Sequence, residues 1–412
     1  MNVLYQCCAG LDVHKKLIVA CLRRIDESGQ AHSEVRTYGT MTEELLALSD
    51  WLTSQGCTQV AMESTGVYWK PVYNILEGQL EILVVNVQHM KTVPGRKTDV
   101  QDAAWIAELL QHGLLKASFI PPRAQREWRD LTRYRTSLVR ERSRLVNRLQ
   151  KVLEDANIKL AGVATDVMGV SARQMLEALV RGESDSQVLA ELARGRLRQK
   201  IPQLRAALTG HFQSHHRFLI AEQLIHIDFL DEALEHLNRE IGERLVPFEE
   251  ELQLLDTIPG IDRRIAEDLL AEIGPDLERF PDAGHLASWA GLCPGHNESA
   301  GKRHSGKTRK GSPWLRSTVI EAAHGAAHKK NVYLSAQYHR LAGRKGKKKA
   351  LLAVGHSIIV IAYYILKRRQ PYHDLGANYF DQRQQDMVQR KCVHRLQKLG
   401  FKVTLEPAAL AA

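Results

Sequence analysis

The sequence Lys97-Thr98-Asp99-Val100-Gln101-Asp102 begins a segment in which the spacing of acidic and apolar residues indicates how the first part of the chain folds. Apolar residues follow it at positions 103, 104, 106, 107, 109 and 110, which predicts a helix that ends near Gln111. Asp99 and Asp102 are three residues apart, so a helix projects both carboxylates from one face of its first turn. Such acids often only cap a helix and complement its dipole. Two carboxylates this close repel each other unless a cation lies between them.

The residues before this helix predict a mixed α/β sheet. The expected elements are strands at 5–13, 17–22 and 34–38, a helix at 42–54, a strand at 59–62, a helix at 68–76, a strand at 81–87 and the helix after Asp99. The polar turn His14-Lys15-Lys16 joins the first two strands into a hairpin. The order βββ-α-β-α-β-α indicates an α/β domain.

Two further acids end predicted strands of this sheet. Asp12 ends the first strand in an apolar context, and Glu63 directly follows Val60-Ala61-Met62. Either residue alone is compatible with a strand leaving the core for solvent. Together with Asp99 and Asp102, however, they supply four carboxylates from distant parts of the sequence. Hard divalent cations prefer oxygen ligands, so this set suits a site for two metal ions.

Composition indicates a polyanion as partner. The 412 residues carry a formal net charge of +10, with an isoelectric point near 9.3. The six cysteines form no Cys-x-x-Cys pair, which favours reduced thiols over a disulfide framework or a zinc site. We expect no signal peptide, and we expect the apolar stretch at 350–366 to be a buried helix that does not cross a membrane.

Pro121-Pro122 separates the sheet from a helical segment. Helices are predicted at 124–154 and 218–245, and both carry apolar residues seven apart: Leu131, Leu138, Leu145 and Val152 in the first, and Ile220, Ile227, Leu234 and Ile241 in the second, with Leu230 and Leu237 at companion positions. These stripes fit either a hairpin within one chain or a dimer. The first helix also carries a row of arginines, which forms either a solvated face or a track for phosphates: Arg126, Arg129, Arg133, Arg140, Arg144 and Arg148.

The remaining sequence is strongly basic. The stretch Thr257-Ile258-Pro259-Gly260-Ile261 predicts either a phosphate-binding helix-hairpin-helix or a packing unit of the same shape. Between residues 299 and 369 there are 17 lysines and arginines and one acid, so this segment holds +16 and the rest of the chain −6. Tyrosines and one tryptophan are interleaved and suit base stacking. The predicted nucleic-acid contacts are Lys302, Arg303, Lys307, Arg309, Lys310, Arg316, Arg344, Lys345, Lys347, Lys348 and Lys349.

Motifs at both ends of the chain resemble one known family. The first domain contains Gly10-Leu11-Asp12-Val13-His14-Lys15, Met62-Glu63-Ser64-Thr65-Gly66 and Lys97-Thr98-Asp99-x-x-Asp102-Ala103. The basic region contains Gly291-Leu292-Cys293-Pro294-Gly295-His296-Asn297-Glu298-Ser299-Ala300-Gly301-Lys302, followed by Lys310-Gly311-x-x-x-Leu315-Arg316. The sheet resembles the RNase H/RuvC-like nuclease fold, and the motifs resemble those of the DEDD-type transposases of bacterial insertion sequences.

The resemblance implies a mechanism. In that family four acids hold two Mg²⁺ ions per active site, and they correspond to Asp12, Glu63, Asp99 and Asp102. A serine nucleophile corresponds to Ser299, which would form a covalent phosphoserine with DNA. This chain has Ala300 where the family commonly has glycine, so Ser305 and Ser312 are alternative nucleophiles. The nearby His296 and His304 are either proton carriers or ordinary contacts.

The resemblance also implies partners and domains. The expected partners are donor DNA, target DNA, a structured guide (bridge) RNA and further copies of the chain, as a dimer of dimers in the bacterial cytoplasm, associated with the nucleoid and without a membrane. The expected domains are a RuvC-like catalytic domain (1–120), a helical coiled-coil spacer (121–255), a basic transposase domain (256–375) and a polar tail (376–412). Two alternatives remain open: a structure-selective nuclease that uses water, and a non-catalytic nucleic-acid scaffold.

Overall fold

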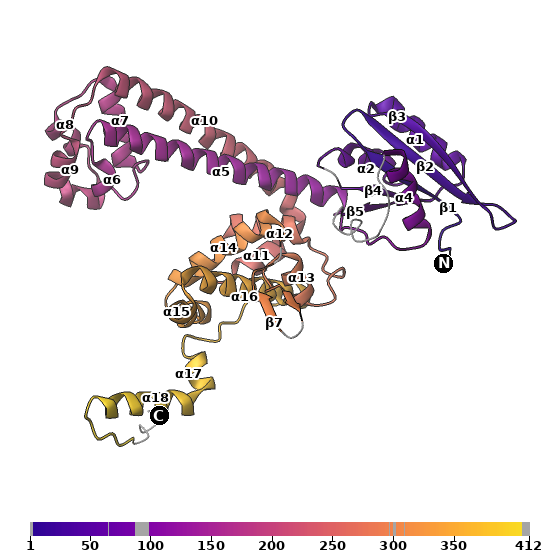
Figure 1. Cartoon of the computed structure of the whole chain (residues 1–412). Helices are drawn as coiled ribbons and strands as arrows, with labels where there is room; N and C mark the ends of the chain where they lie inside the picture. The colour runs from indigo at the N-terminus through magenta and orange to yellow at the C-terminus, as the bar shows by residue number, and fades with distance from the viewer. Residues whose placement is uncertain are drawn as a thin grey trace. The chain divides into compact units, whose positions relative to one another are not determined.

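The computed structural model describes residues 3–64, 66–86, 99–295, 297–299, 302–308 and 310–405 (Figure 1). Within these ranges the side chains of 99–101, 297–299, 302–305, 386 and 388 are outside the description. The chain divides into two compact units, Met1–Pro121 and Pro122–Ala412. Each unit is considered by itself.

The first unit contains one mixed sheet. Its strands are β1 (Cys7–Val13), β2 (Leu17–Ile25), β3 (Ala31–Gly39), β4 (Gln59–Glu63) and β5 (Glu81–Val85). They lie in the order β3-β2-β1-β4-β5, with β1 in the centre. β1 pairs antiparallel with β2 and parallel with β4, while β2–β3 is antiparallel and β4–β5 is parallel. The predicted order of elements is confirmed.

In the described part of this unit, helices cover both faces of the sheet: α1 (Thr42–Ser54), α2 (Trp69–Leu76) and α4 (Asp99–Gln111). Because side chains alternate along a strand, β1 presents Ala9, Leu11 and Val13 to one face, where they join the core formed with α1 and α2. Cys8 faces the other way and packs with Ile106 of α4. Both faces of β1 are therefore buried, which explains its nearly continuous apolar sequence.

The contact between α4 and β1 requires a glycine. A Cβ atom added to Gly10 would lie 2.3 Å from the carbonyl oxygen of Ala103 and 2.4 Å from the backbone nitrogen of Ala107. Both are backbone atoms, so no side-chain rotation relieves the clash. Any residue larger than glycine would push the helix away from the strand.

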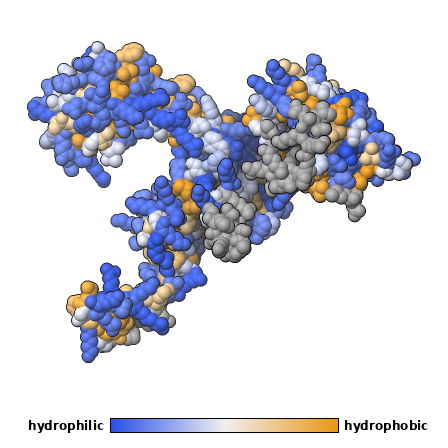
Figure 2. All heavy atoms as spheres, viewed as in Figure 1, coloured by the Kyte–Doolittle hydropathy of each residue, from blue (hydrophilic) through white to orange (hydrophobic). Residues whose placement is uncertain are grey.

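The second unit begins with a helical hairpin, α5 (Arg123–Asp155) and α10 (Ser214–Leu245) (Figure 1). Leu138 and Leu145 of α5 share one apolar core with Ile220 and Ile227 of α10. The heptad residues at these positions therefore face each other within one chain, as the hairpin interpretation predicts. Figure 2 shows mainly hydrophilic residues on the visible surface of this hairpin.

The segment 160–210, to which the sequence assigns no role, extends the same core. It forms α6 (Leu160–Val163), α7 (Val170–Arg181), α8 (Ser186–Glu191), the 3₁₀ helix η1 (Gly195–Lys200) and α9 (Ile201–Leu208). Met175, Leu176, Leu189 and Leu204 are fully buried there beside residues of α5 and α10. These short helices cover the end of the hairpin that is far from the C-terminal helices (Figure 1).

A second apolar core lies in the C-terminal part of the unit. It is built from η2 (Val246–Phe248), α11 (Glu249–Asp256), α12 (Arg263–Ile273), α13 (Ala283–Trp289), α14 (Pro313–His328), α15 (Tyr333–Lys345) and α16 (Lys347–Arg368). Among the described helices, α16 has the length and hydropathy of a possible membrane span. Its side chains Val354, Ile358, Ile359 and Ala362 are fully buried in this core, as predicted for a buried helix at 350–366.

The tail contains more regular structure than the sequence predicts. The polar segment after 376 forms α17 (Tyr379–Arg383) and α18 (Gln385–Lys398). Tyr379 and Phe380 pack their rings on Tyr333 of α15, with ring centroids 5.2 Å apart in both pairs. Aromatic contacts thus hold the start of the tail on the basic helices.

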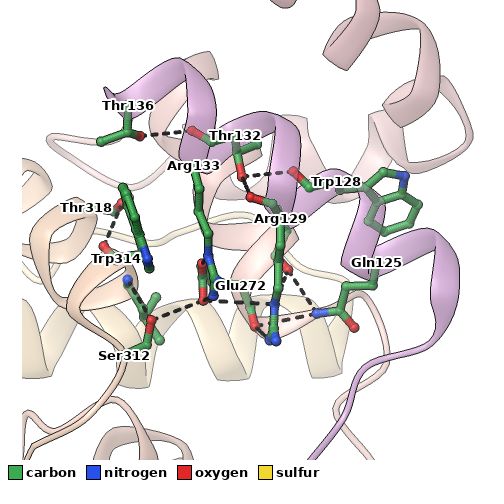
Figure 3. A network of polar contacts seen from close by, with 12 residues as sticks. Gln125, Trp128, Arg129, Thr132, Arg133, Thr136, Glu272, Ser312, Trp314 and Thr318 are labelled. Carbon is green, nitrogen blue, oxygen red and sulfur yellow. Dashed lines mark hydrogen bonds and ion pairs between the residues drawn. The ribbon is translucent and has the colours of Figure 1, made fainter. Parts of the chain in front are cut away.

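Buried charges join α5 to α12 (Figure 3). Arg133 donates two hydrogen bonds to Glu272, at 2.7 and 3.0 Å, and Arg129 donates to the carbonyl oxygen of Ala271 at 3.1 Å. Burial lowers the pKa of Arg129 to about 10. At least three of the six arginines predicted as a solvated face or a phosphate track are bound to protein acceptors, because Arg140 also donates to the hydroxyl of Ser317, at 3.1 Å. Figure 3 shows both side chains pointing from α5 toward Glu272.

Arg135, two residues after Arg133, is buried among acids. Its guanidinium donates to Glu267 at 2.6 Å and to Asp268 at 2.7 Å, and it also bonds Asn238 of α10 at 3.1 Å. Burial raises the pKa of Asp268, and the charge of Arg135 opposes that rise. One arginine therefore ties together α5, α10 and α12.

Replacing Arg135 with Met should lower the free energy of unfolding of the second unit by about 3–5 kcal/mol, because Asp268 would remain buried without its guanidinium and Glu267 would keep only its contact with Arg263. Differential scanning calorimetry of the full chain measures this change. Arg142→Met is the matched control, since Arg142 pairs with Asp231 in a partly exposed position and should contribute less than about 1 kcal/mol. Equal effects of the two substitutions would contradict the role assigned to Arg135.

Candidate functional site

Two of the predicted acids lie at the carboxyl ends of neighbouring parallel strands. β1 and β4 pair Gly10 with Ala61 and Leu11 with Met62, so Asp12 and Glu63 are the next positions in register. Their Cα atoms are therefore separated by about one strand spacing, roughly 4.8 Å. Strand alternation places both side chains on the face covered by α4, the face of Gly10 and Ala61. Asp12 is only 7% exposed, and Glu63 is half-buried.

The first turn of α4 lies at the same edge of the sheet. The backbone nitrogen of Leu4, before β1, bonds the carbonyl oxygen of Gln111 at the end of α4, at 2.8 Å. Ala103, near the start of α4, packs instead with Val19, the residue that pairs with Asp12. The helix thus runs antiparallel to β1 and begins where β1 ends.

This direction brings a third acid to the edge. Asp102 directly precedes Ala103, whose carbonyl oxygen lies against Gly10, two residues from Asp12. The side chain of Asp102 is half-buried. Asp99 is the first residue of α4, one turn earlier, but its side chain is outside the described residues, as are Lys97 and Thr98 entirely. The four predicted acids therefore come from β1, β4 and the start of α4.

The structure adds His14, which the sequence did not single out as a site residue. Its Nε2 lies 3.0 Å from Oδ2 of Asp12. The hydrogen bond fixes the orientation of a nearly buried carboxylate, as groups around metal ligands commonly do. His14 belongs to the sequence motif around Asp12, but that motif assigned it no role of its own. The carboxylate oxygens of this edge fit a hard cation such as Mg²⁺.

A second cluster could be mistaken for a metal site. Ligand atoms of Asp155, His215 and His216 lie within 4.8 Å of one another, at the junction of α5 and α10. However, Nδ1 of His216 accepts the backbone N–H of Gln213 at 3.1 Å, so a neutral His216 carries its proton on Nε2. That Nε2 lies 2.9 Å from Asp155. Both nitrogens are therefore used in capping α10 and binding α5.

Ser299 lies in a small hairpin of β6 (Asn297–Ser299) and β7 (Lys302–Ser305). Ser299 ends β6 and pairs with Lys302, which begins β7, so it stands next to the two-residue connection of the hairpin. The side chains of Ser299, Lys302, Arg303 and Ser305 lie outside the described part of the chain, together with all of His296, Ala300 and Arg309. The backbone places Ser299 at the tip.

The base of this hairpin is fixed to the helical core. The backbone nitrogen of Gly295 donates to the carbonyl oxygen of Lys307 at 2.9 Å, and Arg316 donates to Gly291 at 3.3 Å and to Thr308 at 2.9 Å. A Cβ added to Gly311 would lie 2.5 Å from the backbone of Gly291. Arg316, predicted as a nucleic-acid contact, thus has acceptors within the protein, and a phosphate would compete with them.

Of the alternative nucleophiles, Ser312 has a structural role. Its hydroxyl accepts the backbone N–H of Leu315 at 3.3 Å as the N-cap of α14, and it donates to Glu272 at 3.2 Å (Figure 3). A cap that also donates to a buried carboxylate is poorly placed to attack a phosphate. Ser305 stays an alternative.

The turn at Gly260 serves helix packing. Gly260 has a φ of +92°, and an added Cβ would lie 2.2 Å from the carbonyl oxygen of Ala322 in α14. Asp262 then caps α12 by accepting the N–H of Ile265 at 2.8 Å. An acid at this helix start opposes an incoming phosphate. These contacts favour the packing unit over the phosphate-binding hairpin.

The predicted basic contacts at the junction of α15 and α16 are all exposed: Arg344, Lys345, Lys347, Lys348 and Lys349. The last three occupy the first turn of α16, where the positive end of the helix dipole disfavours cations. Lys307 and Lys310 are also exposed. A bound phosphate chain would relieve this concentration of like charge.

Comparison with known proteins identifies the family. A family model described as "Transposase" matches residues 9–158, which include all four acids. A second, described as "Transposase IS116/IS110/IS902 family", matches residues 252–340, which include Ser299. The chain belongs to the DEDD-type transposases of insertion sequences.

Individual relatives agree with this assignment. The transposase for insertion sequence element IS1111A of Coxiella burnetii is 24% identical over 375 residues, which cover 88% of this chain and 90% of the relative. The pilin gene-inverting protein of Moraxella bovis is 31% identical over 122 residues, 29% of this chain and 38% of that protein. A protein of insertion element IS116 from Streptomyces clavuligerus is 26% identical over 245 residues, 52% of this chain and 60% of that protein. The transposase therefore acts on DNA, and its family indicates use of a divalent metal.

Asp12→Asn should weaken binding of Mn²⁺, used as a probe for the metal site, by at least about tenfold, because an amide supplies less negative charge than a carboxylate. Isothermal titration calorimetry or electron paramagnetic resonance measures the affinity. Glu27→Gln is the control, since Glu27 is an exposed acid in the turn after β2, at the opposite edge of the sheet. Unchanged affinity in Asp12→Asn would remove Asp12 from the metal site.

Proposed function

We propose that this transposase cuts and rejoins DNA through a covalent phosphoserine at Ser299. The observation that carries the proposal is the convergence of Asp12, Glu63 and the start of α4 at one sheet edge, in a chain whose basic part presents Ser299 at a hairpin tip. The sheet order, with β1 central between an antiparallel and a parallel neighbour, supports an RNase H/RuvC-like first domain.

Asp12, Glu63, Asp99 and Asp102 would hold two Mg²⁺ ions, which stabilise negative charge on the attacking and leaving oxygens. The Ser299 hydroxyl loses its proton as its oxygen bonds to phosphorus. The bond from phosphorus to the 3′ oxygen breaks, and that oxygen takes up a proton to give a free 3′-OH. A 3′-OH of another strand then attacks the phosphoserine and regenerates the serine. The number of phosphodiester bonds is conserved, so no nucleotide triphosphate is consumed.

We further propose that a structured guide RNA selects the DNA sequence. Base pairing between the RNA and each DNA would carry sequence choice, while the protein reads backbone and shape. Support comes from the exposed cations at the junction of α15 and α16 and from the +16 segment that contains them. We expect the transposase to be in the cytoplasm, associated with the nucleoid.

We propose that the hairpin of α5 and α10 provides one of the contacts of a dimer of dimers, through residues other than its heptad residues. Phe218, Ile225 and Phe229 lie on one face of α10, opposite the side that packs on α5, and are 64%, 63% and 63% exposed. Large exposed apolar side chains at helical spacing fit the same face of a second copy.

Ser299→Ala should abolish a protein–DNA adduct that survives denaturing electrophoresis, because alanine has no oxygen to bond phosphorus. The substrate is DNA carrying the ends of the element, with Mg²⁺ present. Ser305→Ala should still form the adduct, and Ser312→Ala should form it while losing about 1 kcal/mol of stability from its helix cap. An adduct in Ser299→Ala would move the nucleophile elsewhere, and metal-dependent cleavage without any adduct would identify a nuclease that uses water.

Ile225→Glu combined with Phe229→Glu should shift the protein to a smaller assembly in sedimentation velocity. Charged side chains cannot be buried against a second copy without a large desolvation cost. Val188→Glu is the control on the same arm, because Val188 is 48% exposed but lies on α8, away from that face. An unchanged sedimentation coefficient would exclude this stripe as an interface.

A further inference from the structure

A pocket of about 510 Å³ in the second unit takes no part in the proposed reaction. It lies between α16, the segment 370–375 and the start of α15. Its walls include the rings of Tyr333, Tyr364 and Tyr372, with His356 and His373, over an apolar floor that contains Val360. This volume lies within the usual range for sites that hold small organic groups.

Hydrogen bonds hold the walls in place. Asp374 accepts the backbone N–H of Tyr333 at 3.1 Å and the hydroxyl of Tyr372 at 3.0 Å. The backbone nitrogen of Tyr372 donates to the hydroxyl of Thr257 at 2.9 Å. The segment after α16 is therefore tied to both α15 and the end of α11, and the pocket is formed before any ligand enters.

The charge of the pocket suits an anion. No aspartate or glutamate in the described part of the chain lines it, and the adjacent Asp374 is engaged by Tyr333 and Tyr372. Arg368 lies over the ring of Tyr364, 4.8 Å from the ring centroid. Among the described residues no carboxylate pairs with Arg368. The exposed Lys329 and Lys330 come just before Tyr333, and most of the lining belongs to the segment with 17 cations and one acid. A neutral apolar partner would gain nothing from these charges.

Polar groups inside the pocket can form hydrogen bonds with the edge of a base. Burial lowers the pKa of His356, so its imidazole is neutral near pH 7 and offers one donor and one acceptor. The hydroxyl of Ser357 is already bonded to Gln337 at 2.9 Å. The side chains of His356, Gln370 and His373 supply hydrogen-bonding groups in the lining, beside stacking surfaces.

We propose that this pocket receives one unpaired base of a bound nucleic acid, stacked on Tyr364, with its phosphate on Arg368. The inference rests on the proposed function only in that the chain binds nucleic acid. Bases inside a duplex are stacked on their neighbours and cannot enter, so the ligand is a single-stranded loop, bulge or end. Stacking on an aromatic ring accepts any base, and the adjacent arginine adds a cation.

The test uses the full chain and a single-stranded 12-nucleotide RNA that contains 2-aminopurine, whose fluorescence falls when the base stacks. Tyr364→Ala should lower the affinity about five- to a hundredfold and reduce the quenching, whereas Tyr364→Trp should retain both. Arg368→Ala should weaken binding and reduce the slope of log affinity against log salt by about one. Tyr134→Ala, which removes an exposed tyrosine from α5, is the matched control.

Tyr364 is 41% exposed, so its truncation should leave the thermal unfolding curve unchanged and the comparison valid. Equal affinity and quenching in Tyr364→Ala and Tyr134→Ala would overturn the inference, as would equal quenching by the same sequence in a duplex. Failure of the proposed function has a different signature: a protein that stacks the base through Tyr364 but never forms a DNA adduct would keep the pocket and lose the phosphoserine mechanism.

Discussion

The approach of α4 to β1 at Gly10 determines where the acidic residues meet. Because a strand residue without a side chain lets the helix backbone lie directly on it, Ala103 and its neighbour Asp102 reach the level of Asp12. The parallel pairing of β1 with β4 then supplies Glu63 from the next strand. The site therefore depends on a missing Cβ as much as on the acids themselves, and the metal chemistry of this family needs that fixed geometry.

In the second unit, the long hairpin of α5 and α10 has to be held against the C-terminal helices. Buried charge serves this purpose, with Arg135 and Arg133 of α5 bound to acids of α12. Such pairs repay their desolvation cost only when the geometry is good, so they tolerate few alternative arrangements. An apolar contact of the same size would allow the helices to slide or rotate more easily.

Local periodicity predicts most elements of this chain, because burial on one face leaves a repeat of two or 3.6 in the sequence. The order of the sheet elements, the long helices and the acids at strand ends were all accessible in this way. The same repeat says which face is buried but not what covers it, so the stripe through Ile220 and Ile227 did not reveal its partner. Nor does sequence show that Arg129 and Arg135 are buried, since their acceptors are more than 100 residues away.

The hairpin of α5 and α10 sets a length scale for any assembly. α5 has 33 residues, and at 1.5 Å per residue it extends about 50 Å, comparable to one and a half turns of duplex DNA. Within the second unit, this length separates the short helices of residues 160–210, at one end of α5, from α12, at the other. Removing two helical turns from both α5 and α10 would shorten the hairpin by about 10 Å but leave the same residues facing outward. The length of the hairpin can therefore change in evolution without changing the orientation of its exposed face.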